Sequence, residues 1–385
     1  MDRTDDRLMA LHPSARLRAH LAWLRRGQGA LQLRRPFGAT LVWAAVVLAG
    51  LAAGVEIFAR SEQGSELIPL RGVGSRHFQF EVKVDRLEKL AETAGPVDCL
   101  FLGDSTVHQA VDPALITARL KQDPGVAMTC FNFGVRGLNQ AVLAPLAEIL
   151  VDEYRPAWLL VGVNVTGLQR RLAVPDNDAI LGSPWVRQRL GDPNWEGWLL
   201  DHSRAYRAFD PFRNWMQDDY LEELLWEIGR WRNMDPFGHL SPTTVLAEPL
   251  PDMTVPLNQA IAGLMISFEP SPENLAGLER TLELTRSGVQ VVLVEIPVHA
   301  GFLTLLENGR ADYDRGRQTV ADLAQRHDAV FLMDDSFDQL IPLDGWSNLN
   351  HMNRNGSQIF SAWLSGRLAG LLRAGRLHAE EPVSP

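Results

Sequence analysis

The segment VDCLFLGDSTVHQ (97–109) indicates the fold class most directly. It opens with an apolar run that ends in Gly103, as a buried strand of a parallel sheet does. Ser105 follows at a turn, and Asp112 with the proline after it supplies an N-cap and a first-turn residue for a helix over 113–120. A strand, a turn and a helix in this order form the repeating unit of an α/β protein.

The same alternation continues along the chain. Further strand-like apolar runs occupy residues 126–134, 157–164, 289–297 and 329–335, and helical patterns occupy 138–153, 274–288 and 358–373. We therefore expect an α/β domain over 95–375, a flavodoxin-like three-layer sandwich with a five-stranded parallel sheet, followed by a tail over 376–385.

Residues 165–285 interrupt this rhythm between the third and fourth strands. They hold six of the eleven tryptophans: Trp185, Trp195, Trp198, Trp215, Trp226 and Trp231. We expect a mostly helical insertion there, in which the tryptophans either stack on sugar rings or pack a helical core.

A long apolar segment precedes the α/β domain. Residues 37–55 contain nineteen residues without a charge, and a helix of that length reaches about 28 Å, enough to cross a hydrocarbon core. We expect a transmembrane signal anchor over 37–58, with a lipid bilayer as its partner. A cleaved signal peptide is the alternative, although the basic region before the span is long for one.

The arginines before this span predict its orientation. Arg34 and Arg35 directly precede the apolar run, and basic residues are sparser after it. The positive-inside rule then places an Arg-rich tail (1–36) in the cytoplasm and a stem (59–94) with one helix outside. The expected localisation is the inner membrane of a bacterium, with a single pass and a periplasmic or extracellular α/β domain.

Charge and cysteine content argue against a nucleic-acid partner and against a cysteine metal site. The net charge of -10 argues against a nucleic-acid partner. Cys99 and Cys130 lie in apolar runs without metal-ligand spacing, so buried thiols and a disulfide are both open. We expect no metal and no cofactor.

Four short blocks place polar residues at one edge of the predicted sheet. Ser105 follows the first strand, Gly134 and Gly137 form a turn after the second, Asn164 follows the third, and His351 precedes the last helix. Ligands bind at the carboxyl edge of a parallel sheet, and glycine lets backbone N–H groups approach them.

These residue types are the ones that acyl transfer needs. A serine hydroxyl becomes a nucleophile when a base takes its proton, a role that His351 fills for Ser105. The oxyanion that then develops needs fixed donors, which the backbone amides of Ser105 and Gly137 and the side-chain amide of Asn164 supply.

The order of the four blocks resembles the SGNH/GDSL hydrolase superfamily, whose markers are Ser, Gly, Asn and His. Gly-Asp-Ser at 103–105, Gly137, Asn164 and His351 match these markers in chain order. Within the superfamily, the chain is similar to bacterial membrane-anchored proteins that acetylate alginate or serve D-alanyl transfer to teichoic acid. The resemblance implies an esterase or O-acyltransferase that acts on an acylated, most plausibly acetylated, polysaccharide, with a multi-pass membrane acyltransferase as a further partner.

One position departs from the family pattern. Asn348 stands three residues before His351, where the family has an aspartate. Asn348 can orient the imidazole but carries no charge, Asp344 is a substitute within the same loop, and a backbone carbonyl is a third possibility. A catalytically degenerate scaffold or binding protein of a polysaccharide-modification or secretion assembly is therefore the alternative to an enzyme.

Three other residues near these blocks carry weaker signals. His299 follows the fourth strand, where it either touches substrate or caps the strand. His108 lies three residues after Ser105 and is expected to pack on a helix surface. Asp104 is expected to shape the turn before Ser105 rather than to react.

Overall fold

The computed structural model describes residues 35–169, 175–213, 220–246 and 269–379 of the chain. The chain divides into two compact units, Met1–Gln63 and Gly64–Pro385, which are described separately. Most of the expected cytoplasmic tail (1–36), and the end of the expected C-terminal tail, lie outside the described residues.

The described part of the first unit is dominated by the helix α2 (Arg35–Arg60). Within it, the segment Gly38–Arg60 is long and apolar enough to cross a membrane, and none of its most apolar window is buried. Large apolar side chains such as Trp43 and Leu48 are exposed along it. The helix expected over 37–58 is therefore present, with the length and composition of a membrane span.

The second unit is built on one sheet of five parallel strands. These are β1 (Cys99–Gly103), β2 (Cys130–Gly134), β3 (Trp158–Val163), β4 (Gln290–Glu295) and β5 (Val330–Leu332). They lie in the order β2-β1-β3-β4-β5, and every neighbouring pair is parallel. The predicted five-stranded α/β sheet is thus confirmed, and its strand order reverses between β1 and β3, where α/β proteins place their ligands.

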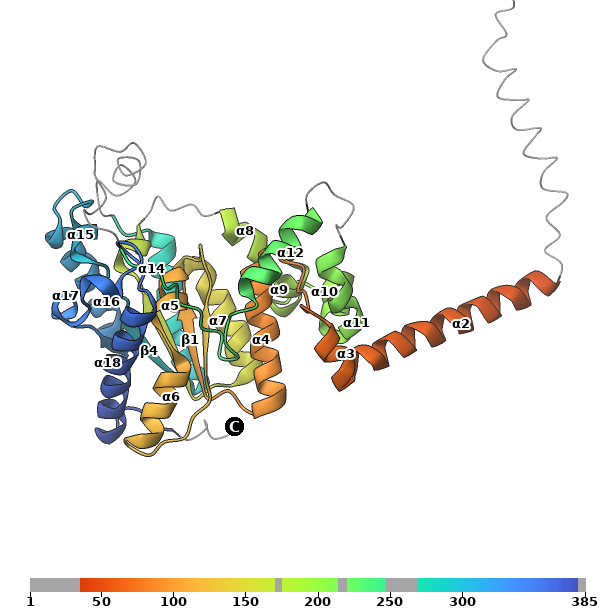
Figure 1. Cartoon of the computed structure of the whole chain (residues 1–385), viewed down its shortest axis with the longest axis horizontal. Coiled ribbons are helices and arrows are strands. Elements are labelled where there is room, and N and C mark those ends of the chain that lie inside the picture. Colours follow the sequence, from red (N-terminus) through yellow and green to blue (C-terminus); the bar gives the residue numbers. More distant parts are fainter. Residues whose placement is uncertain (1–34, 170–174, 214–219, 247–268, 380–385) are drawn as a thin grey trace, which may run out of the picture. The chain divides into compact units, whose positions relative to one another are not determined.

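Helices cover both faces of this sheet (Figure 1). One face packs against α4 (Phe78–Ala94), α7 (Gln140–Tyr154), α14 (Pro272–Leu282) and α16 (Arg310–Arg326), and the other against α6 (Pro113–Gln122) and α18 (Arg354–Arg373). Successive strand residues alternate between the two faces: Leu100 and Leu102 join the first core, while Cys99 and Phe101 join the second.

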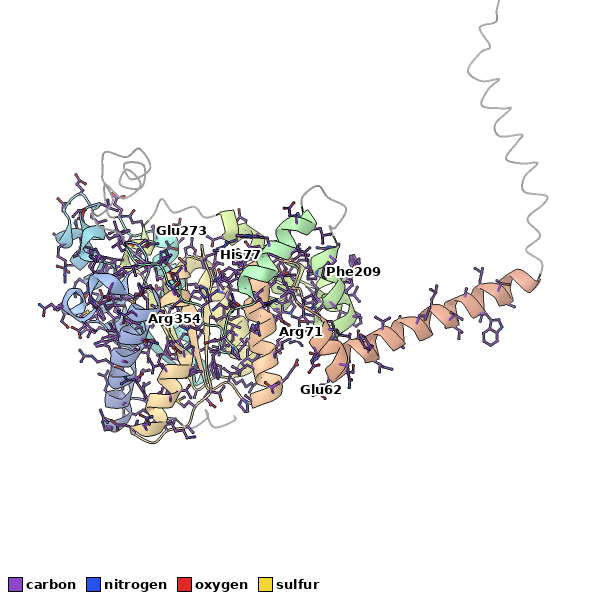
Figure 2. The ribbon with its side chains drawn as sticks, in the orientation of Figure 1. Glu62, Arg71, His77, Phe209, Glu273 and Arg354 are labelled. Atoms are coloured by element: carbon purple, nitrogen blue, oxygen red, sulfur yellow. The ribbon has the colours of Figure 1, made fainter. Side chains whose placement is uncertain are left out.

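The expectation of a separate stem over 59–94 is wrong for its second half, because α4 (Phe78–Ala94) belongs to the α/β domain. Phe80, Val84 and Leu87 of α4 are buried in the core of the sheet because their spacing forms an apolar stripe on one helix face. The linker before α4 is fixed as well, since buried Arg71 forms an ion pair of 2.6 Å with Asp85. Figure 2 labels Arg71 beside α4.

The insertion is mostly helical, as expected, but shorter than predicted. Within the described residues, its helices are α8 (Pro175–Leu181), α9 (Pro184–Arg189), α10 (Trp195–His202), α11 (Arg204–Phe209) and α12 (Tyr220–Trp231). Helix α14 also falls within 165–285, yet it packs on the sheet core through Leu278 and Leu282 and so belongs to the sandwich.

The tryptophans of the insertion divide between core and surface. Trp185 and Trp231 are buried, which agrees with helical packing. Trp195, Trp198 and Trp226 are exposed, and Trp215 lies outside the described residues.

The remaining elements of the described residues are short. They are α3 (Glu62–Leu67), α5 (Ser105–Ala110), α15 (Ala300–Leu303), α17 (Phe337–Leu340), η1 (Val165–Leu168), η2 (Asp210–Phe212), η3 (Glu283–Ser287) and η4 (Leu343–Gly345). Cys99 and Cys130 are register partners on β1 and β2, and both are buried free thiols. Burial raises the pKa of the Cys99 thiol.

Candidate active site at the carboxyl edge of the sheet

Ser105 opens the short helix α5 immediately after β1. Asp104 caps this helix, because its Oδ1 accepts hydrogen bonds from the backbone N–H of Thr106 at 2.8 Å and from the Thr106 hydroxyl at 2.5 Å. The turn is tight because Val107 packs directly over Gly103 and Gly162, where any added Cβ would overlap its side chain. Ser105 is thereby held at the carboxyl edge of the sheet, and its backbone N–H lies in the first turn, where it has no intrahelical acceptor.

Gly134, at the end of β2, allows α5 to approach the sheet. A Cβ added there would overlap the backbone nitrogen of His108 and lie 2.8 Å from its Cα. Gly137 in the following turn has a φ of 73°, a left-handed conformation that glycine adopts without strain. Of the predicted glycine block, Gly134 therefore lies beside the helix that carries Ser105.

Asn164 lies where β3 ends, next to β1 in the sheet. Its Oδ1 accepts hydrogen bonds from the backbone N–H of Thr166 at 3.1 Å and from the Thr166 hydroxyl at 2.7 Å. Because Oδ1 is used in this cap, Nδ2 is the group of Asn164 that can donate to a ligand.

His351 lies in a loop closed by a bridge between Trp346 and Met352. Its Nε2 is 2.8 Å from the hydroxyl of Ser105, which confirms the predicted approach of these two residues. On the other side of the ring, Nδ1 is 3.0 Å from Oδ1 of Asn348. Burial lowers the pKa of His351, and the negative charge of Asp104 opposes this effect. A neutral imidazole that accepts the Ser105 proton is therefore favoured near neutral pH.

Asn348, rather than Asp344, is the partner of His351. The Oδ1 of Asn348 also accepts the backbone N–H groups of Asn350 at 3.0 Å and His351 at 2.9 Å, so three donors hold one oxygen. Asp344 is exposed, and within the described residues its carboxylate makes no hydrogen bond to His351. The expectation that Asp344 could take the place of the missing aspartate is wrong for this conformation, because the loop directs that side chain to solvent.

His299 supports the loop that carries His351. Its Nδ1 accepts a hydrogen bond from the backbone N–H of Gly301 at 3.0 Å, which caps α15. The backbone N–H of His299 donates to the carbonyl of Leu349 at 2.9 Å. The ring also packs edge-on against Trp346 at 5.8 Å between centroids. His299 thus caps the helix α15 rather than the strand β4, which ends at Glu295, and substrate contact stays a prediction.

His108 packs as expected. Its buried ring lies 5.5 Å from the ring of Trp231, measured between centroids. Burial lowers the pKa of His108, which favours the neutral form.

A strap formed by residues 235–246 runs from β2 to the loop that carries His351 and was not predicted. It begins beside β2, where the backbone N–H of Asn132 donates to the carbonyl of Phe237 at 2.8 Å. It ends beside the His351 loop, where the N–H of Leu246 donates to the carbonyl of Trp346 at 2.7 Å. The sequence DPFGHLSP (235–242) indicates turns but does not indicate which residues they contact. The path of the strap is therefore visible only in the fold.

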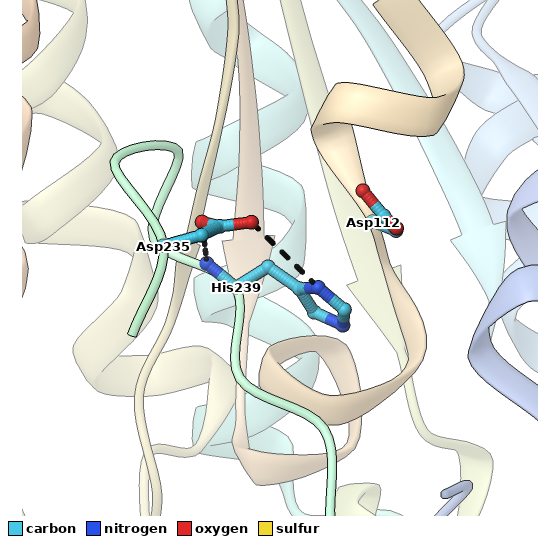
Figure 3. A group of neighbouring side chains, drawn as sticks. All are labelled: Asp112, Asp235 and His239. Atoms are coloured by element: carbon cyan, nitrogen blue, oxygen red, sulfur yellow. Dashed lines mark hydrogen bonds and ion pairs between the residues drawn. The ribbon is translucent and has the colours of Figure 1, made fainter. Parts of the chain in front are cut away.

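Three titratable residues meet where the strap passes α6 (Figure 3). One ligand atom each from Asp112, Asp235 and His239 lie within 4.8 Å of one another, a spacing that a metal ion could bridge. Each residue also serves the backbone or the strap: Asp112 caps α6, Asp235 accepts two N–H groups of the strap, and His239 Nε2 lies 2.7 Å from the hydroxyl of Ser241. These bonds explain the group as an anchor for the strap without a metal.

A cavity of about 810 Å³ lies at the opposite edge of the sheet. It is lined by residues that precede β1, β3 and β4, among them Asp98, Arg155 and Val289. Because Ser105 and Asn164 follow the strands, this cavity lies at the other end of the sheet from them.

No family model matches the chain, and no curated protein matches it. Among solved structures, it is similar to a lipase/acylhydrolase from Enterococcus faecalis at 10% identity, covering 73% of this chain and 97% of that one, with a TM-score of 0.34. An acetylxylan esterase from Geobacillus stearothermophilus matches at 13% identity, 72% and 93% coverage and a TM-score of 0.35. An α/β hydrolase from the metagenome of Lake Arreo, Spain, matches at 14% identity, 73% and 95% coverage and a TM-score of 0.35. No assignment of function rests on likenesses of this size.

Proposed function

We propose that the protein is a serine esterase or O-acyltransferase of the SGNH/GDSL type that works through an acyl-enzyme on Ser105. One observation carries the proposal: the hydroxyl of Ser105 lies 2.8 Å from Nε2 of His351, whose Nδ1 is in turn held by Asn348. A nucleophile, a base within hydrogen-bond reach and a group that orients the base are the parts that covalent acyl transfer needs.

In the proposed reaction, His351 takes the proton of Ser105 while Oγ attacks the carbonyl carbon of an ester. The carbonyl oxygen becomes an oxyanion, which the amides of Ser105 and Gly137 and Nδ2 of Asn164 stabilise. Collapse of this intermediate breaks the ester bond, and His351 returns the proton to the departing alcohol. Attack by water on the acyl-serine makes the protein a hydrolase, whereas attack by a sugar hydroxyl makes it a transferase.

The substrate that we propose is an acyl ester, with acetyl as the acyl group, of a cell-envelope or exported polysaccharide. The apolar helix α2 supports this choice, because an anchor holds the α/β domain at the membrane where such polymers are made. We propose a single pass through the bacterial inner membrane, a periplasmic or extracellular α/β domain, and a multi-pass membrane acyltransferase as donor of the acyl group.

A second function is favoured by one residue. Asn348 offers His351 a neutral oxygen, and a neutral partner does not stabilise the imidazolium that forms during attack. The second proposal is therefore a binding or scaffold protein of a polysaccharide-modification or secretion assembly, which retains the fold without turnover.

A fluorophosphonate probe tests the two proposals, because it labels only an activated serine. We expect the full chain in detergent to be labelled, Ser105→Ala to abolish labelling, and Ser336→Ala, a change at a surface turn after β5, to leave it intact. A folded wild-type chain that is not labelled would favour the scaffold. For a labelled chain, acetate release from an acetylated polysaccharide, with and without a second polysaccharide as acceptor, separates hydrolase from transferase.

A further inference from the structure

Asp104 directly precedes the nucleophile and uses only half of its carboxylate for the turn. Its Oδ1 accepts both hydrogen bonds from Thr106, whereas Oδ2 has no hydrogen-bond partner among the described residues. A Cβ added at Gly167 would lie 3.7 Å from this Oδ2 and 3.7 Å from Cβ of Asn164. The free oxygen therefore lies beside Gly167 and Asn164, where β3 ends next to β1, one residue before the serine whose hydroxyl contacts His351.

This placement matters because the ring of His351 has no charged partner of its own. Its two nitrogens contact the Ser105 hydroxyl and the Asn348 amide, and both groups are neutral. An imidazolium formed in a half-buried site needs a nearby negative charge, or proton transfer to it is disfavoured.

Other titratable and charged groups lie on the elements and loops next to His351 in the described part of the chain, and none of them bonds to its ring. They are His108 in α5, His299 before α15, Asp344 in the same loop and Arg354 at the start of α18. The histidines and the arginine offer no negative charge, and Asp344 is directed to solvent.

We propose that Asp104 supplies the negative charge that Asn348 lacks, and so stabilises the His351 imidazolium during attack by Ser105. The inference rests on the proposed function and deepens it. Asp104 acts through His351, which makes it a positioning residue with a second task besides capping α5. Its charge already raises the pKa of His351 against the effect of burial, in agreement with this role.

The substitution Asp104→Asn removes the charge and keeps the cap, because asparagine caps helices as well as aspartate does. The readout is the rate constant of fluorophosphonate labelling of the detergent-solubilised full chain as a function of pH. For Asp104→Asn, we expect the acidic limb of the plot of labelling rate against pH to move to lower pH by about half to one unit. We expect the plateau of this plot to fall by about tenfold, since a weaker base abstracts the proton less readily.

Two further variants give the test its specificity. Asn348→Asp supplies a carboxylate directly to Nδ1, so Asp104→Asn should change the limb and the plateau less in that background than in wild type. Asp112→Asn is the matched control: Asp112 caps the next helix, its Oδ1 accepting the N–H of Leu115 at 3.0 Å, and it has no part in the proposed reaction. We expect it to leave both readouts unchanged.

Each remaining outcome overturns a defined statement. An unchanged limb and plateau in Asp104→Asn would refute the role of Asp104 while the proposed function stands. A lower plateau with an unchanged limb, not restored by Asn348→Asp, would reduce Asp104 to a cap, and a faster plateau would show that its charge opposes the oxyanion instead. A folded wild-type chain without labelling would refute the proposed function itself. Matching thermal unfolding of all variants is the check on folding.

Discussion

At the scale of single residues, the partner of the histidine decides how the site works. Asn348 presents one oxygen to three N–H groups, two from the backbone and one from the ring of His351. An aspartate oxygen accepts the same three hydrogen bonds, so a carboxylate fits this position without a change in the loop.

We predict that Asn348→Asp raises esterase activity on a small activated acetyl ester. The carboxylate stabilises the imidazolium and raises the pKa of His351, so the rate above neutral pH increases, by up to about 10⁴ as judged from serine proteases. The same change moves the acidic limb of activity to higher pH, because His351 must be neutral to act as a base. Steady-state rates across pH measure both effects.

Asp344→Asn is the control for this prediction, because Asp344 is exposed and does not bond to His351 in the described residues. We expect it to leave activity unchanged. If Asp344→Asn abolished activity while Asn348→Asp had no effect, the loop would have to adopt another conformation during turnover, and our choice of Asn348 as the orienting residue would be wrong.

At the scale of elements, the contact between β2 and α5 positions Ser105, the proposed nucleophile. We predict that Gly134→Ala destabilises the protein by about 1–3 kcal/mol and sharply lowers fluorophosphonate labelling of Ser105. The added methyl group would overlap the backbone of His108, so α5 has to move away from the sheet. Chemical denaturation and labelling rates check the two effects.

Gly229→Ala is the matched substitution for this prediction. Gly229 lies inside α12, and a Cβ added there meets nothing within 4 Å. Alanine is the better helix former, so we expect equal or greater stability and unchanged labelling. Equal behaviour of the two variants would show that the close approach of α5 is not required.

A second element-scale prediction concerns Glu81 in α4. Its buried carboxylate accepts hydrogen bonds from the backbone N–H of Ser75 at 2.9 Å and from the Ser75 hydroxyl at 3.2 Å. Burial, with the nearby charge of Asp210, raises the pKa of Glu81 to about 7. A group whose pKa is higher in the folded state stabilises the fold below its unfolded pKa, and this stability is lost as pH rises through the folded value.

We therefore predict that Glu81→Gln stabilises the protein above pH 7, by up to about 3 kcal/mol at pH 8, and has little effect near pH 4. Glutamine keeps the acceptor for Ser75 and removes the charge. Denaturant unfolding at several pH values measures the difference, and Glu66→Gln on the exposed surface of α3 is the control. A stabilisation that does not vary with pH would refute the assigned titration.

At the scale of the whole molecule, we predict that residues 61–385 lie outside the cytoplasm. The apolar segment Gly38–Arg60 is the candidate span, and Arg34 and Arg35 precede it. Alkaline phosphatase fused to the C-terminus should be active in cells, whereas a fluorescent cytoplasmic reporter at the same place should be dark. An inactive phosphatase fusion, together with a fluorescent reporter fusion, would contradict this topology.

The sequence by itself determined the layers of the fold and the residues that we propose for the site. Apolar runs that alternate with amphipathic helices predict a parallel sheet, because side-chain periodicity is a local property. Ser105 and Asn164 could be placed at one edge for a similarly local reason: both follow strands, and the carboxyl ends of parallel strands meet there.

Tertiary structure alone decided which side chains work together. Ser105 and His351 are 246 residues apart in the chain, and their 2.8 Å contact depends on how α5 and the His351 loop pack on the sheet. The choice of Asn348 over Asp344, the free oxygen of Asp104 and the strap over 235–246 depend on the same packing. Such contacts join residues that no local pattern relates, because burial and hydrogen-bond geometry, rather than spacing along the chain, select the partners.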